Sequence, residues 1–128
     1  MDPTVRRALS HGHLIDITTT GRLTGAPRRI EITFHNLDGR IYISGIPHPT
    51  RTRAWIRNLE ADSRLVFHLK APVRADLPAT ARVIVDPEER RGVLTRIARI
   101  WHRDPQQMIA HSPLIEVSID GYEVEAAA

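Results

Sequence analysis

Alternating apolar and polar residues mark a series of short strands along the chain. In residues 28–36, Ile30, Ile32 and Phe34 alternate with polar residues that end at His35. This period of two gives a strand one buried face and one wetter face. Similar runs predict strands at 14–20, 40–45, 64–70, 79–85 and 114–119.

Helix-start residues predict a long helix in the second half of the chain. Asp86 is placed as an N-cap, and a proline and two acids follow it in the first turn. The helix is expected to run to about His102. Its apolar stripe is expected at Val93, Ile97, Ile100 and Trp101. Short helical stretches are expected at 5–9 and 105–110.

The order of these elements predicts the fold class. Most strands follow one another through turns or loops, such as residues 71–78 with Pro72 and Pro78, and this favours an antiparallel sheet. We expect an α+β fold that is mainly β, with about six antiparallel strands and two to three peripheral helices in a small, partly open barrel. With 128 residues, the expectation is a single domain over residues 1–128.

Composition narrows the functional classes. The chain has no cysteine, so disulfide and thiolate chemistry are excluded. Its histidines lack metal-ligand spacing, and no metal site is expected. The sequence contains no apolar run of transmembrane length, and its first residues lack the apolar core of a secretion signal. A cytoplasmic protein without a transmembrane segment is therefore expected.

Positive charge is concentrated in one part of the chain. The net charge is +3, but residues 22–57 hold seven arginines against Glu31 and Asp38, a local charge of +5. A local basic field attracts an anionic partner. Nucleic acid is the less favoured partner, because aromatic residues make up only 5% of the chain and form no stacking row.

A basic loop between the first two predicted strands is the main candidate site. Gly21 and Gly25 bracket Arg22, and Pro27 stiffens the exit before Arg28. Successive backbone amides in such a turn can bind an anion, and guanidinium groups can grip a phosphate or carboxylate. The alternative interpretation is a solvent-exposed hairpin that binds nothing, in which the arginines serve only solubility.

A second basic loop, residues 45–52, precedes a predicted helix. Thr52 is placed to cap this helix near Arg53, and Trp55 and Leu59 share one of its faces. Free amides at a helix start also favour anions. Trp55 fits either core packing or a ligand contact.

None of the common catalytic motifs occurs in the chain. The phosphate-binding and dinucleotide-binding glycine motifs and the hydrolase Gly-x-Ser-x-Gly elbow are all missing. If the protein is an enzyme, a cofactor is expected to carry the chemistry.

Two segments give a family resemblance. Residues 18–29, Thr-Thr-Thr-Gly-Arg-Leu-Thr-Gly-Ala-Pro-Arg-Arg, resemble the signature of the deazaflavin-dependent nitroreductase family. Residues 49–59 resemble a second segment of that family, and Ser44-Gly45 stands where it has a serine before a glycine-rich loop. The resemblance implies a split β-barrel that binds coenzyme F420, with FMN as the alternative. It implies hydride transfer to a small quinone, nitro or enone acceptor; the alternative is a non-catalytic protein that binds a lipid, a flavin or another small molecule.

The resemblance also implies a set of site residues and a homodimer. The coenzyme's phosphate and polyglutamate tail would lie at Arg22, Thr24, Gly25, Arg28 and Arg29. Ser44, Gly45 and the loop through Arg53 to Trp55 would line the phosphate and the ring. Ser44 or His48 would orient or protonate the acceptor. The chain departs from the family at Leu23, where a lysine is usual, in a longer loop at 44–55, and in lacking late tyrosines.

Overall fold

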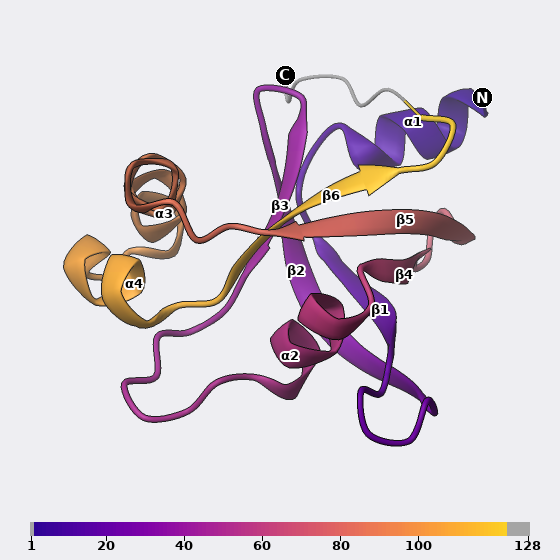
Figure 1. Cartoon of the computed structure of the whole chain (residues 1–128). Coiled ribbons are helices and arrows are strands. Elements are labelled where there is room, and N and C mark those ends of the chain that lie inside the picture. The colour runs from indigo at the N-terminus through magenta and orange to yellow at the C-terminus, as the bar shows by residue number, and fades with distance from the viewer. Residues whose placement is uncertain (1, 123–128) are drawn as a thin grey trace.

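The computed structural model describes residues 2–122, which form a closed barrel of six antiparallel strands with four helices around it (Figure 1). The strands are β1 (Leu14–Thr20), β2 (Pro27–Leu37), β3 (Arg40–Ser44), β4 (Arg64–Leu69), β5 (Ala75–Val83) and β6 (Leu114–Ile119). The helices are α1 (Pro3–Leu9), α2 (Ala54–Ala61), α3 (Pro87–Trp101) and α4 (Pro105–His111). The predicted mainly β fold with six antiparallel strands is confirmed, with one helix more than expected.

The strands follow the order β1-β2-β3-β6-β5-β4 around the barrel. Tight hairpins join β1, β2 and β3, as the sequence predicts. The expected opening is absent, because residues 16–19 of β1 pair with residues 65–68 of β4 and close the barrel. In the described residues, β1 therefore has a neighbour on each side and offers no free edge.

Alternate strand residues fill the inside of the barrel. Ile15, Ile17, Ile43, Phe34 and Phe67 are fully buried there, and the two phenylalanine rings meet edge-on at 5.2 Å. Helix α1 adds Val5 and Leu9 beside the start of β1, and α2 adds Trp55, Ile56 and Leu59 near its end. Burial of these side chains is the main force that holds the barrel together.

A second apolar cluster lies outside the barrel, under α3 and α4. Leu94, Ile97 and Ala98 of α3 pack with Met108 of α4 on residues of β2, β3 and β6. The predicted stripe was partly wrong, because Ile100 is 53% exposed, whereas Val93 and Trp101 lie at the edge of the cluster.

Helix α3 also buries His35, which the strand pattern placed on the wetter face. Its side chain is 6% exposed, and its ring lies 5.2 Å from that of Trp101. The alternation along β2 is correct, but α3 covers the outer face at this point, so both faces of the strand are buried. Burial lowers the pKa of His35 to about 4.

The fifth strand was predicted four residues too late. It begins at Ala75 and includes Pro78, which the sequence placed in a loop. The Pro78 carbonyl accepts a hydrogen bond from Asp120, and the β5–β6 ladder begins one residue later, at the Ala79–Ile119 pair. The missing N–H of Pro78 therefore falls at the end of a ladder, where a proline is tolerated in a strand.

Two helix starts also differ from the sequence-based expectation. The N-cap of α2 is Arg53 rather than Thr52, and no side chain caps this helix. Helix α1 begins two residues earlier than the expected turn, because the carboxylate of Asp2 accepts a hydrogen bond from the Thr4 amide. No helix in residues 2–122 is both long and apolar enough to cross a bilayer.

Candidate functional site

Backbone hydrogen bonds shape residues 21–26, which we call the basic hairpin. The Gly21 amide donates to the Ala26 carbonyl, and the Gly25 amide donates to the Gly21 carbonyl, each at 2.8 Å. Gly25 has φ of 74°, a left-handed conformation that glycine adopts without strain. The tip is exposed, and Leu23 is 82% exposed. The hairpin thus holds a fixed turn while burying little of its own surface.

A cavity of about 620 Å³ lies between the basic hairpin and the start of α2. We call it the basic cavity; it is lined by Thr19, Gly21, Arg22, Leu23, Thr24, Pro27, Arg28, Arg29, Ile30, Arg51, Arg53, Ala54, Trp55 and Asn58. Five arginines and no carboxylate stand in this lining. Of the five, Arg29 is paired with Asp16 at 2.9 Å. The other four, Arg22, Arg28, Arg51 and Arg53, form no ion pair within residues 2–122, so their charges remain available to an anion.

Arg53 carries an unsatisfied donor at this site. Its Nη2 donates to the Ile46 carbonyl, whereas its Nη1 is buried and has no hydrogen-bond partner among the described residues. Burial and the charge of Arg51 lower the pKa of Arg53. A buried unpaired donor is costly, and a ligand oxygen at this position would satisfy it.

A second cavity, of about 530 Å³, lies beside the first. We call it the tryptophan cavity, because Trp55 and Trp101, which are the two tryptophans of the chain, both line it. Ser44, Gly45 and Ile46 form part of its wall. Ile30, Arg53 and Trp55 line both cavities, so the two cavities are neighbours that share a wall. We call the pair the groove, with a cationic end and an aromatic end.

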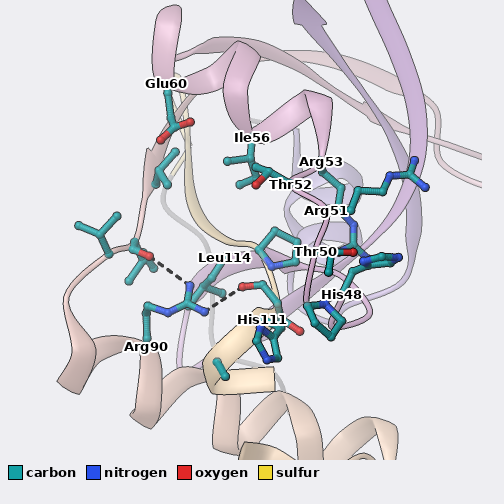
Figure 2. Close-up of a pocket in the computed structure, with 17 residues that line it drawn as sticks. His48, Thr50, Arg51, Thr52, Arg53, Ile56, Glu60, Arg90, His111 and Leu114 are labelled. Carbon is teal, nitrogen blue, oxygen red and sulfur yellow. Dashed lines mark hydrogen bonds between the residues drawn. The ribbon is translucent and has the colours of Figure 1, made fainter. Parts of the chain in front are cut away.

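A third cavity, of about 550 Å³, lies on the other side of the 48–53 loop; we call it the His48 cavity. Figure 2 shows His48 and His111 at one end of it and Glu60 at the other. Arg90 enters from α3 and donates to the carbonyls of Ile109 and Ser112, at 2.8 and 2.9 Å. Figure 2 draws the bond to Ser112. Its charge is thus engaged in holding the segment that leads from α4 to β6.

The predicted site residues divide among these cavities. Arg22, Thr24, Arg28, Arg29, Arg53 and Trp55 line the basic cavity, and Ser44 and Gly45 line the tryptophan cavity. Gly25 lines a smaller hollow on the outer side of the hairpin. His48 lines the His48 cavity, apart from Ser44, and Arg53 lines all three larger cavities.

Three lining residues of interest were not named among the predicted site residues. Arg51 lies in the loop that was predicted to line the site, two residues before Arg53, but it was not singled out. Asn58 follows Trp55 by three residues, so helical spacing could have placed both on one face. No sequence pattern places Trp101 at the site, because only the packing of α3 against the barrel brings it into the same cavity as Ser44.

Two comparisons place this geometry among known proteins. A family profile described as F420H(2)-dependent quinone reductase matches residues 2–125. No curated protein sequence matches the chain. The solved structures include an F420 reductase, 16% identical, with a TM-score of 0.63 over 90% of this chain and 93% of the other. They also include an F420-H2 dependent reductase, 17% identical, with a TM-score of 0.59 over 82% of this chain and 93% of the other.

A third solved structure is a putative 5-nitroimidazole antibiotic resistance protein from Bacteroides thetaiotaomicron. It is 16% identical, with a TM-score of 0.64 over 93% of this chain and 80% of the other. At these identities the three structures show a shared fold, while the family match spans nearly the whole chain and carries the assignment. The protein belongs to the F420H2-dependent quinone reductase family and is an F420-dependent reductase.

Proposed function

We propose that the protein binds reduced F420 in its groove and that hydride passes directly from the coenzyme to a small quinone, nitro compound or enone. The observation that supports this most directly is the pairing of two neighbouring cavities. One is lined by four arginines without ion pairs in the described chain, and the other, which shares Arg53 and Trp55 with it, is walled by both tryptophans. Such a groove matches a ligand with an anionic tail at one end and a planar ring at the other.

The cationic end fits the phosphate and the glutamate tail of the coenzyme. Arg22 approaches from the basic hairpin and Arg28 from the start of β2, whereas Arg51 and Arg53 approach from the loop before α2. Guanidinium groups form paired hydrogen bonds with phosphate and carboxylate oxygens. The buried Nη1 of Arg53 supplies a donor that a ligand oxygen can satisfy. Thr24 and Arg29 complete the hairpin side of this proposed site, and Gly25 contributes the left-handed turn rather than a lining surface.

The aromatic end fits the deazaflavin ring. Ser44 and Gly45 form one wall, and a Cβ on Gly45 would lie 3.1 Å from Pro113 and 3.5 Å from Arg53, so a bare backbone is favoured there. When bound, reduced F420 supplies the hydride, so the protein's own task is to bind, orient and shield the ring. Trp55 and Trp101 offer apolar faces for this purpose.

Ser44 and His48 take different parts in the proposed reaction. The Ser44 hydroxyl donates to the Pro113 carbonyl at 2.6 Å, so its proton is engaged, and we assign it an orienting role as a hydrogen-bond acceptor. His48 lines the His48 cavity, which shares Arg53 with the tryptophan cavity, and we assign it as a proton donor to an acceptor that reaches past Arg53 to the ring.

A titration panel tests the proposal. Purified protein is titrated with F420, FMN and duplex DNA, and oxidation of reduced F420 is then followed with a naphthoquinone, a nitroimidazole and a cyclic enone. We expect binding to F420 in preference to FMN and DNA, and turnover with at least one acceptor. F420 binding without turnover of any acceptor would favour the non-catalytic ligand-binding alternative, and tighter binding to DNA, falling steeply with salt, would favour a nucleic-acid function.

Three further properties stay predictions. We expect one domain over residues 1–128, a cytoplasmic location and a homodimer. The closed barrel removes exposed strand edges as a reason for dimerisation, so light scattering on the purified protein is the deciding measurement for the dimer.

A further inference from the structure

The two groups of arginines in the basic cavity come from separate segments. Arg22 and Arg28 belong to the basic hairpin and its exit, and Arg51 and Arg53 belong to the loop before α2. Like charges repel one another, and no carboxylate in the lining offsets them. The exposed hairpin tip has little apolar surface to hold it close to α2. A specific contact must therefore keep the two groups of arginines together before any anion binds.

Asn58 supplies that contact. Its side chain is 6% exposed, and its Oδ1 accepts a hydrogen bond from the Arg22 amide at 3.1 Å. Its Nδ2 donates to the hydroxyl of Thr19, which is 2% exposed, at 3.0 Å. One buried side-chain amide thus joins the end of β1 and the first residues of the basic hairpin to α2. Loss of this amide would leave a buried hydroxyl and a backbone N–H without their partners.

The position of Asn58 within α2 links the hairpin to the other residues that line the basic cavity. It lies one helical turn after Ala54 and three residues after Trp55, and all three line the basic cavity. Because a short helix moves as a unit, fixing Arg22 to Asn58 also fixes the hairpin relative to Arg53 and Trp55. A ligand then meets a preformed cleft and does not have to order the hairpin on binding.

We propose that Asn58 is a positioning residue that sets the gap between the two groups of arginines and so determines affinity for the phosphate and tail of the coenzyme. This inference rests on the proposed function, because it takes the groove to be the F420 site. It assigns Asn58 no contact with the reacting atoms.

Asn36 provides a matched control within the same chain. It is 7% exposed, donates from Nδ2 to the Leu9 carbonyl at 3.1 Å, and accepts from the Gly39 amide at 2.9 Å. It thus joins two segments through one buried amide, as Asn58 does, but it lines none of the three larger cavities. Replacement by alanine at either position removes buried side-chain hydrogen bonds that join two segments.

The test compares Asn58→Ala with Asn36→Ala in two binding titrations. One titration uses F420. The other uses the deazaflavin analogue of riboflavin, which has the same ring but lacks the phosphate and the tail. For Asn58→Ala we expect the Kd for F420 to rise about tenfold while the Kd for the analogue changes by less than about twofold. For Asn36→Ala we expect neither Kd to change by more than about twofold. Amide hydrogen exchange over residues 21–26 should accelerate in Asn58→Ala alone.

The outcomes separate the positioning role of Asn58 from the proposed function. Equal affinity of Asn58→Ala and the wild type for F420, or equal losses for F420 and the analogue, overturns the positioning role. A wild type that does not bind F420 overturns the proposed function, and hydrogen exchange still decides whether Asn58 anchors the hairpin. If Asn58→Ala does not fold, Thr19→Val removes only the Thr19 half of the contact and should raise the Kd for F420 by a smaller factor.

Discussion

Trp55 of α2 and Trp101 of α3 line the same cavity, although they come from helices on different sides of the barrel. The chain has no other tryptophan, so intrinsic fluorescence reports directly on this cavity. Trp101 is held there by His35, whose ring lies 5.2 Å away.

Ligand binding should therefore quench tryptophan fluorescence. We expect F420 to quench the emission of Trp55→Phe and of Trp101→Phe, because each variant keeps one tryptophan in the groove. Trp101→Ala should weaken binding of F420 and of the phosphate-free analogue by similar factors, since it removes a contact of the ring rather than of the tail. A change in only one of the two affinities would contradict the placement of the ring against Trp101.

The unpaired arginines should carry the affinity for the anionic tail. We expect Arg28→Ala to raise the Kd for F420 about tenfold and to weaken the dependence of affinity on salt, because it removes one charge that salt screens. Arg91→Ala is the control, since Arg91 is an exposed arginine of α3 outside the groove and also forms no ion pair in the described residues. Similar losses in both variants would indicate a general effect of net charge, and titration at two salt concentrations separates the cases.

Two glycines should respond in opposite directions to substitution by alanine. Gly92 lies within α3, and a Cβ there would meet nothing within 4 Å, so Gly92→Ala should stabilise the protein by about 1 kcal/mol. A Cβ on Gly12 would lie 2.2 Å from the Phe34 carbonyl oxygen, so Gly12→Ala should destabilise it by about 2 kcal/mol or more. Urea unfolding of both variants measures these changes. A stable Gly12→Ala would show that the lead-in to β1 can move away from β2.

His35 should make stability fall as the solution is acidified. Its pKa is about 4 in the folded protein because the ring is buried, and about 6.5 when unfolded. Between these values the unfolded chain binds more protons, so acidification from pH 6.5 to pH 4 favours unfolding by about 3 kcal/mol in total, and the loss levels off below pH 4.

The variant His35→Phe should lose this part of the pH dependence. The pKa of Asp16 is lowered by hydrogen bonds from Lys70 and Arg29, so its contribution is lost only at lower pH and is shared by both proteins. Urea unfolding at pH 7, 5.5 and 4 measures the difference. Parallel curves for the wild type and His35→Phe would mean that His35 is not buried as a neutral ring.

Local patterns were sufficient to predict most of the fold. The alternation of Ile30, Ile32 and Phe34 predicts β2, and Asp86 with Pro87 predicts the start of α3, because each signal depends on neighbours in the chain. Pro78 led to a predicted start of β5 that was too late. A proline is tolerated in this strand because the ladder with β6 begins only after it, and that position depends on where β6 ends. The burial of His35 depends in the same way on α3, which is distant in sequence.

The sequence alone determined the strands, the basic hairpin and the family to which they belong, because periodicity, turn residues and motifs are local properties. Only the tertiary structure decided that the barrel closes, that Trp101 joins Trp55, and that Asn58 joins the hairpin to α2. These relationships connect residues far apart in the chain. Their physical origin is the packing of strands and helices around a shared apolar core, which no short window of sequence contains.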